Sequence, residues 1–336
     1  MKRINILLIT LAAVGFAACS GDDDDNKIIT PEEPAQTLRP LTIEVSETPM
    51  VNPEAPSNSP KRGENAPATR AAVTTLSTLS AFNLEYMYGA LPYYNDKSIT
   101  ANKDGEGKWT TTGSWPDTDT NNEVNWYAHS HGTFFLTDDA NKYPYISFTV
   151  EETATKQKDL LVATASGTWD ETKGNLSFTF DHACTALRFY VKKATNLSDY
   201  TLSITNVTLC NVIKQGEYYY GTQSWMPGSS RSNYTLYSGS AKTLGTTDYE
   251  ALDASAAPYL FLIPQTLTPW DGTTAIASAT TQTYLQISCS ISGATSFSGT
   301  AYIPFAGTFV QGKQHDVKIN IGKNSLYSNA NTKIIN

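Results

Sequence analysis

The sequence has few of the residues that most often build a catalytic or metal site. It contains four histidines and four cysteines in 336 residues, and the short motifs of nucleophile elbows, phosphate loops, zinc proteases and dinucleotide-binding folds are missing. Adjacent acidic residues such as Glu151 and Glu152 point to opposite faces of a strand and cannot flank one bond. The sequence therefore argues against an enzyme, although a glycosidase built from distant carboxylates stays open.

Positive charge, paired cysteines and long apolar runs are scarce as well. The net charge of -8 argues against nucleic acid as a partner, because phosphate binding needs clustered Lys and Arg. Cys184, Cys210 and Cys289 are odd in number and far apart, so we expect buried thiols rather than a disulfide framework. No segment has the eighteen or so apolar residues that a spanning helix needs.

The histidines give only a weak indication of a metal site. His129 and His131 are two residues apart and could form half of a zinc site on one side of a strand, but no further ligand is visible nearby. We favour two surface or edge histidines. His182 lies in a strand-like run, where we expect a packed and hydrogen-bonded side chain. The prediction is therefore no metal and no cofactor.

The first 37 residues have the pattern of an export and anchoring signal. A positive start and the apolar stretch Ile4–Phe16 precede small residues and Cys19, which is typical of a bacterial lipoprotein signal over residues 1–18. Cleavage between Ala18 and Cys19 would free Cys19 to carry acyl chains, whereas the alternative is an ordinary buried thiol. Residues 19–37, with four consecutive aspartates, would form an acidic tether. This start resembles the signal that sends Bacteroidota lipoproteins to the outer membrane surface.

Apolar and polar residues alternate in many places from residue 41 onward, and sustained helical periodicity is almost absent. "LTIEV" puts Leu41, Ile43 and Val45 on one face of a predicted strand. Similar runs, separated by Gly, Pro, Asn and Asp clusters, are "AFNLEYMY", "YISFTV", "DLLVATA", "LSFTFDHACTALRFYVKK", "YTLSITNVTLCNV", "APYLFLIPQTL", "TYLQISCSIS" and "KQHDVKINIG". The sequence predicts an all-β protein of sandwich type. The turn-rich run Thr168–Asn175 predicts a domain boundary near residue 170.

Six segments of the sequence, in their order and approximate spacing, resemble the fimbrillin family, the subunits of type V pili. The segments are "TRAAVTTLSTLSAFNLEYMYG", "VNWYAH", "YISFTVEETATKQKDLLVATA", "LSFTFDHACTALRFYVKK", "LFLIPQTLTPWDG" and "YIPFAGTFVQGKQHDVKINIG". Each segment alone is a strand with a turn attached. Together they cover about residues 38–322, behind a lipoprotein signal.

The resemblance implies two tandem transthyretin-like β-sandwich domains, at residues 71–170 and 171–336. It also implies a propeptide, residues 38–70, that an arginine-specific or trypsin-like protease removes after Arg70, leaving Ala71 as the new N-terminus. The alternative for Arg70 is a solubilising surface charge. The lost segment would include "LTIEV" as a plug strand, whose removal uncovers a groove for a strand of another pilin subunit.

The resemblance further implies a precursor anchored to the outer membrane by lipid and then an extracellular fimbrium, with adhesion to a host or bacterial ligand. The proline-rich linker Ser46–Arg70 is expected to be exposed and mobile, with Lys61 and Arg62 as competing cut sites. The tail Lys323–Asn336 is short for a donor strand, and Ile334–Ile335 is its sole apolar pair near the end. Shaft and tip roles both stay open.

A surface glycan-binding lipoprotein is the alternative function, because such proteins share the anchor and the β-sandwich. It would require exposed coplanar aromatic side chains. The candidates are Trp109, Trp115, Trp225 and Trp270, and for each of them we favour packing in a core or turn.

Overall fold

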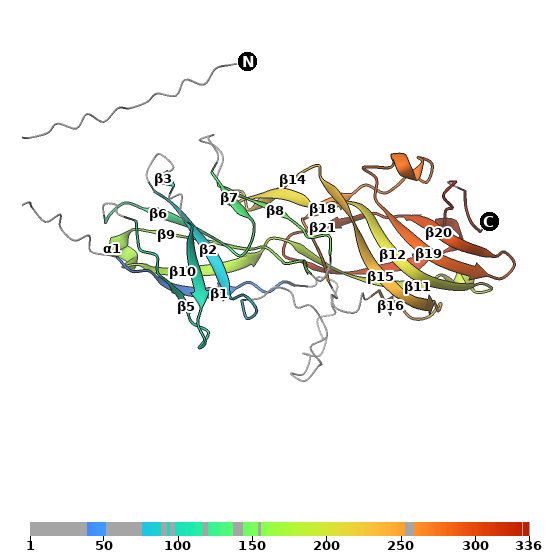
Figure 1. Ribbon diagram of the computed structural model, residues 1–336, viewed down its shortest axis with the longest axis horizontal. Helices are drawn as coiled ribbons and strands as arrows, with labels where there is room; N and C mark the ends of the chain where they lie inside the picture. The colour runs from blue at the N-terminus through green and yellow to red at the C-terminus, as the bar shows by residue number, and fades with distance from the viewer. Residues whose placement is uncertain are drawn as a thin grey trace, which may run out of the picture. The chain divides into compact units, whose positions relative to one another are not determined.

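Strands dominate the chain throughout the part that the structure describes (Figure 1). The structure is a computed structural model. It describes residues 39–51, 76–88, 93–94, 98–116, 120–136, 144–153, 156–252, 259–330 and 332–335. The alternation predicts an all-β protein of sandwich type; the all-β class is confirmed, and the several sheets of the structure are consistent with a sandwich.

The first sheet contains eight strands, in the order β1-β10-β9-β6-β2-β4-β5 with β3 beside β2. Their bounds are β1 Thr42–Glu47, β2 Ala81–Tyr88, β3 Tyr93–Tyr94, β4 Ile99–Lys103, β5 Trp109–Thr111, β6 Val124–His129, β9 Leu161–Gly167 and β10 Asn175–His182. The strands at the two ends of this order, β1 and β5, also contact each other. The sheet therefore curls around its own core.

The remaining strands form smaller sheets: β16-β11-β17 with β22 also beside β11, β15-β12-β19-β20, β14-β13-β8-β7, and β18-β21. Their bounds are β7 Thr133–Phe135, β8 Tyr145–Thr149, β11 Thr185–Lys193, β12 Thr201–Ile213, β13 Gln215–Tyr219, β14 Ser224–Pro227, β15 Arg231–Thr243, β16 Glu250–Ala251, β17 Leu260–Leu262, β18 Gln265–Leu267, β19 Tyr284–Ser292, β20 Phe297–Pro304, β21 Gly307–Phe309 and β22 Gln314–Ile321. The short helices are α1 Trp169–Thr172, η2 Thr195–Leu197, η3 Ile276–Ser278 and η4 Lys323–Ser325.

Strand β10 shows how the alternating pattern positions side chains. Every second residue from Leu176 to His182 is buried and the residues between them are exposed, as the two-residue period of a strand requires. The turn-rich break before β10 contains the one-turn helix α1, which begins with a capping box between Thr168 and Glu171. Lys173 then adopts a left-handed conformation, which ends the helix.

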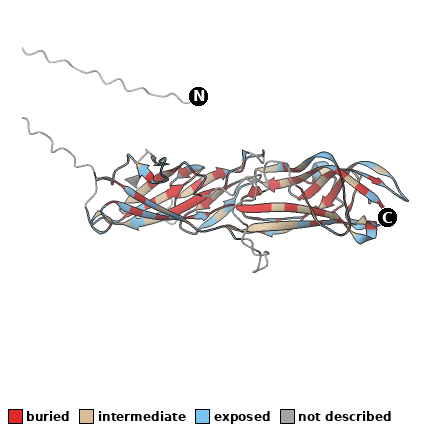
Figure 2. Ribbon diagram, turned by 90° about the horizontal axis from the view of Figure 1, so that it is seen from below, coloured by how far each residue is buried: buried red, intermediate tan, exposed pale blue. Residues whose placement is uncertain are grey.

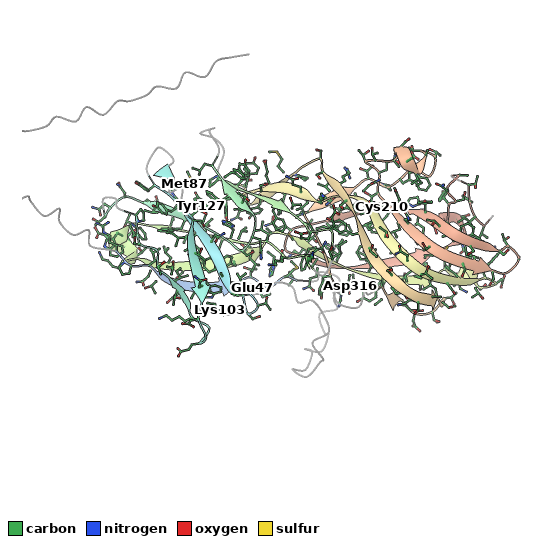
Figure 3. The ribbon with its side chains drawn as sticks, in the orientation of Figure 1. Glu47, Met87, Lys103, Tyr127, Cys210 and Asp316 are labelled. Carbon is green, nitrogen blue, oxygen red and sulfur yellow. The ribbon has the colours of Figure 1, made fainter. Side chains whose placement is uncertain are left out.

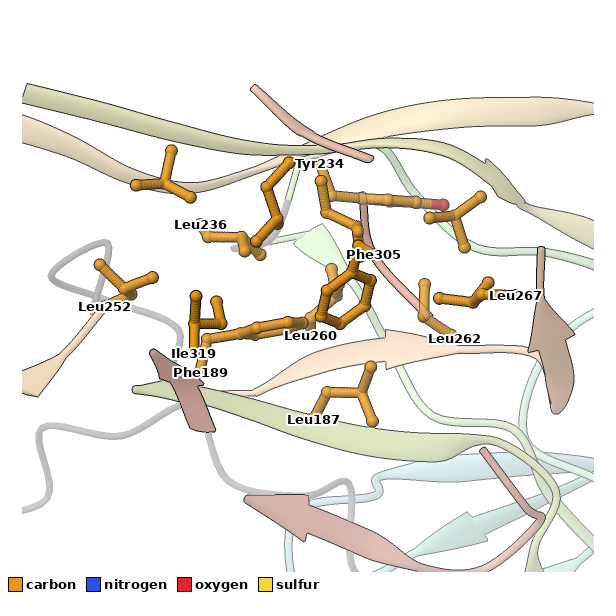
Figure 4. Packing of buried hydrophobic residues seen from close by; sticks show 14 of the residues in the cluster. Leu187, Phe189, Tyr234, Leu236, Leu252, Leu260, Leu262, Leu267, Phe305 and Ile319 are labelled. Atoms are coloured by element: carbon orange, nitrogen blue, oxygen red, sulfur yellow. The ribbon is translucent and has the colours of Figure 1, made fainter. Parts of the chain in front are cut away.

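The buried apolar side chains form two large clusters. Figure 2 marks the buried residues along the ribbon. One cluster lies between residues 41 and 180 and fills the curled first sheet. The other lies between residues 134 and 335 and includes Leu187 and Phe189 of β11 beside Leu260 and Leu262 of β17 (Figure 4). Strand β8 pairs with β13, so β7 and β8 share a sheet with β13 and β14, whereas β10 belongs to the first sheet. The domain boundary near residue 170 and the two transthyretin-like domains stay predictions.

The cysteines Cys184, Cys210 and Cys289 are free and buried, as expected. Burial raises the pKa of the Cys184 thiol well above its usual value, and that of Cys210 and Cys289 to about 11. None of the helices in the described residues has the length and apolar character needed to cross a bilayer.

Candidate functional site: the groove occupied by β1

The strand β1 is held by the first sheet but is distant in sequence from its partner. It pairs in parallel with β10 over its whole length, from Thr42 opposite Asn175 to Glu47 opposite Phe180 (Figure 1). At its two ends, the Thr42 amide donates to the Gly174 carbonyl at 2.8 Å and the Thr48 amide donates to the Phe180 carbonyl at 2.9 Å. β1 is thus a complete edge strand of the sheet.

The chain enters β1 through a close contact with the turn before β10. Gly174 has a φ of 81°, and a Cβ at this position would clash with the carbonyl oxygen of Pro40. Glycine is needed here for both the left-handed conformation and the close approach. On the opposite side, the Trp115 amide donates to the Arg39 carbonyl at 2.7 Å. The start of β1 is therefore held from two directions.

The inner face of β1 closes the first hydrophobic cluster. Leu41 is 8% exposed and Ile43 is 5% exposed, and the half-buried Val45 packs against the same cluster. Ile43 lies opposite Leu176 and Val45 lies opposite Phe178 in the strand register, and both β10 residues are fully buried. If β1 left, these side chains would line an open apolar groove with an unpaired strand beside it.

A charged cluster closes the groove at the C-terminal end of β1 (Figure 3 labels Glu47). The imidazole of His182 lies between two carboxylates: its Nδ1 contacts Asp159 Oδ2, and its Nε2 is 3.0 Å from Glu47 Oε1. Burial alone lowers the pKa of His182, but the hydrogen bonds and charges of Asp159 and Glu47 outweigh it and the pKa is raised. The second Glu47 oxygen accepts the Leu76 amide at 2.7 Å.

The first residues of the predicted linker Ser46–Arg70 are hydrogen-bonded to the body, although Ser46, Thr48, Pro49 and Val51 are exposed as expected. Ser46 lies inside β1 and its hydroxyl is 3.0 Å from that of Thr179. Farther along, Val51 forms a parallel bridge to Lys313, and its carbonyl accepts the Gln314 amide at 2.9 Å. The non-proline residues between the prolines keep the amides and carbonyls that a strand edge can bind.

Several residues predicted from the sequence lie outside the described residues. They are Ala18, Cys19, Lys61, Arg62, Arg70 and Ala71. Lipidation at Cys19 and cleavage after Arg70 therefore stay predictions.

The expectation of surface or edge histidines is wrong for His129. Its side chain is 2% exposed, its Nδ1 lies 3.0 Å from the His131 carbonyl oxygen, and the carboxylate of Glu85 is 3.9 Å from its Nε2. Burial, the largest cause, lowers the pKa of His131 to about 4. Within the ranges that the structure describes, no three His, Cys, Asp or Glu side chains are grouped to hold a metal ion.

The four tryptophans proposed for glycan binding do not form an exposed platform. Trp109, Trp115 and Trp270 are buried, and the half-buried Trp225 donates from its indole nitrogen to the Ala183 carbonyl at 2.7 Å. Packing in a core or turn, the interpretation favoured from the sequence, describes all four. The observation that would favour a glycan-binding surface is thus missing for these residues.

The tail after β22 is folded against the body. Tyr327 exchanges two backbone hydrogen bonds with Tyr302 of β20, and the Ile334 amide donates to the Leu326 carbonyl at 3.0 Å. Ile335 is buried in the second cluster. The apolar pair that could have served as a donor strand is thus part of the chain's own core in this state.

Comparison with known families shows the family of the chain. A family model described as "Fimbrillin-like" matches residues 69–334. The chain belongs to the fimbrillin-like family. The match begins one residue before Arg70, so β1 of this fimbrillin-like chain lies outside it. No curated protein matches the sequence.

Two solved structures resemble this fimbrillin-like chain in fold. A fimbrial protein from Bacteroides vulgatus is 16% identical with a TM-score of 0.51, and the alignment covers 85% of this chain and 96% of that one. A protein from Parabacteroides distasonis, provisionally assigned to cell adhesion, is 8% identical with a TM-score of 0.50, over 86% of this chain and 90% of that one. At these identities the similarity concerns the fold.

Proposed function

We propose that the protein is a structural subunit of a type V fimbria, made as an outer-membrane lipoprotein and activated by cleavage after Arg70. Family membership supports a fimbrial, adhesion-type subunit without catalytic activity, and the similarity of fold to a fimbrial protein agrees with it. The observation that carries the mechanism is β1, an edge strand that fills an apolar groove of the body. In the sequence, residues 52–75 lie between β1 and the next described part of the chain. Cleavage in that segment would leave β1 bound by non-covalent contacts alone.

The energies decide whether the cut strand would stay in place. Burial of Leu41 and Ile43 contributes about 3 to 6 kcal/mol before entropic costs, and the half-buried Val45 adds less. While the chain is intact, the covalent connection between β1 and the body gives β1 an effective concentration on the order of 1 mM at the groove. At micromolar protein this advantage is a factor of about 1000, or about 4 kcal/mol, and it is lost on cleavage.

The cut subunit therefore exchanges its plug for a strand of a neighbouring subunit. The replacing strand restores the hydrogen bonds of the β10 edge and covers Leu176 and Phe178 again. The precursor stays monomeric because its own strand outcompetes an intermolecular one. The mature subunit then assembles in the extracellular fimbrium, where it contributes to adhesion.

Limited proteolysis tests this proposal. Trypsin or an arginine-specific protease should convert the precursor to a discrete product that begins at Ala71 by mass spectrometry, and size-exclusion chromatography should then show oligomers. Arg70→Ala combined with Lys61→Ala and Arg62→Ala, which removes the competing cut sites, should leave a folded, uncut monomer. The protein with Lys61→Ala and Arg62→Ala alone is the matched control that is still processed after Arg70. If the cut product stays monomeric and keeps residues 39–51 bound at micromolar concentration, strand exchange is refuted.

A further inference from the structure

The charged cluster around His182 is not needed to close an apolar groove. His182 and Asp159 belong to the body of the protein, and their side chains are 1% and 0% exposed. Asp159 also accepts the Cys184 amide through its other oxygen, at 3.3 Å, so the carboxylate is fixed whether or not β1 is present. Asp159 therefore holds the ring with its Nε2 directed at the place of Glu47.

Removal of β1 would leave this imidazole without its second partner. A strand that refilled the groove without an acceptor at this place would bury the N–H donor unsatisfied, which costs the free energy of its desolvation, and more when the group is charged. The other charged groups nearby are Asp181 and Lys313, which line a pocket of about 200 Å³ beside His182 together with Thr48 and Pro49. Asp181 precedes His182 on β10 and is exposed on the opposite face of the strand, so its carboxylate does not take the place of Glu47 at Nε2.

Glu47 reaches His182 because it continues the inner face of β1. Leu41, Ile43, Val45 and Glu47 are spaced by two residues, so all four point to the same side of the strand. The groove is thus matched to three apolar side chains followed by one carboxylate. By contrast, Glu44 is exposed on the opposite side, where its carboxylate is 3.4 Å from the Ser177 hydroxyl.

We propose that His182 binds a carboxylate side chain on whichever strand occupies the groove. The occupant in an assembled fimbria is then a strand of a different protein. This inference rests on the proposed function and specifies the partner. The partner strand runs parallel to β10, carries apolar side chains at the places of Leu41, Ile43 and Val45, and carries Asp or Glu at the place of Glu47.

The chain's own tail does not fit this description. The segment Lys323–Asn336 contains lysines but no Asp or Glu, so it has no carboxylate side chain to offer to Nε2. Its apolar residues Ile334 and Ile335 are adjacent and pack against the second cluster, whereas the groove requires spacing by two. A homopolymer joined by this segment would leave Nε2 of His182 without a carboxylate partner at every joint.

Peptide exchange on the full-length chain, cut after Arg70, tests the proposal. The probe is a fluorescent synthetic peptide of residues 39–51, displaced by unlabelled peptides at pH 6, where the imidazole is protonated. The parent peptide should displace the probe. The Glu47→Gln peptide should bind at least 10-fold more weakly, because a hydrogen bond to a charged group contributes about 1.5 to 3 kcal/mol. The Glu44→Gln peptide, which loses the same charge on the exposed face, should bind within about 2-fold of the parent.

Each outcome is decisive. Equal binding of the Glu47→Gln and parent peptides would overturn the role of His182 while leaving strand exchange intact. Displacement by a peptide of residues 323–335 as strong as that by the parent would overturn the requirement for a different protein. If even the parent peptide fails to displace the probe, both the proposed function and this inference fall. His182→Gln in the cut chain should abolish the difference in affinity between the parent and Glu47→Gln peptides. If this variant misfolds, the peptide series on the unaltered chain still tests the proposal, because it changes only the peptides.

Discussion

The groove can be tested in the uncut protein by shortening one side chain of β1. Ile43 is 5% exposed and lies opposite the fully buried Leu176. Replacing a buried Ile by Ala costs about 2 to 5 kcal/mol in a core, and we take about 2 to 4 kcal/mol at this edge strand. Ile43→Ala should therefore increase the population in which β1 is detached by roughly 30- to 700-fold.

Hydrogen exchange measured by mass spectrometry resolves this effect along the chain. The amides of residues 39–51 should exchange faster in the variant by that factor, because a detached β1 loses its hydrogen bonds to β10. The amides of β2, which is separated from β10 by β9 and β6 in the same sheet, should exchange at the wild-type rate. This contrast identifies β1 as a unit that opens on its own.

Thr42→Ala is the matched control, because the Thr42 side chain is exposed on the outer face of the same strand. It should change the exchange of residues 39–51 by less than about 3-fold, since surface substitutions are usually within about 0.5 kcal/mol. The reasoning is refuted if Ile43→Ala accelerates exchange equally in β1 and β2. β1 would then be an integral part of the core that opens only with the whole sheet.

Three further predictions concern a turn, a titration and a thiol. Gly174→Ala should destabilise the protein by about 1 to 3 kcal/mol in urea unfolding, because φ is positive and the added Cβ clashes with the chain entering β1; Gly105→Ala, where the space is open, should stay within about 0.5 kcal/mol. The raised pKa of His182 predicts that its contribution is complete below about pH 6.5, the unfolded pKa, and is lost as pH rises through the folded pKa; urea unfolding from pH 5 to 9 should show this loss, and Glu47→Gln should diminish it. The Cys184 thiol, fully buried with its pKa well above the usual value, should react with a thiol reagent at pH 8 only after denaturation, and labelling of the native protein would contradict its burial.

The strands could be predicted from the sequence because each has its own local signal. The alternation in "AFNLEYMY" coincides with β2 at Ala81–Tyr88, and "LTIEV" overlaps β1 at Thr42–Glu47. The pairing of β1 with β10 could not be predicted in this way, because the register joins residues 133 positions apart. Alternation shows which face of a strand is buried but not which strand lies beside it.

The inward position of Glu47 could be predicted from the sequence, but its partner could not. Glu47 falls on the same phase as Leu41, Ile43 and Val45, so its carboxylate points inward. An acidic residue on a buried face indicates a partner, yet the partner His182 lies 135 residues away. The surface position expected for His129 is wrong because the second face of β6 becomes covered along the strand, from the exposed Asn125 through the half-buried Tyr127 to the buried His129. At that end of the strand both faces are covered, and the contrast on which alternation relies is lost.

The long separation between β1 and β10 has a consequence for how the chain acquires its structure. A polypeptide emerges N-terminus first, so β1 is complete well before the strand that will hold it. Closing so long a loop is slow compared with forming local hairpins such as β19-β20. We therefore expect newly made molecules to pass through a stage at which the body is folded and the groove is vacant. At that stage a neighbouring molecule's β1 competes with its own, and domain-swapped dimers are the expected by-product of crowded expression.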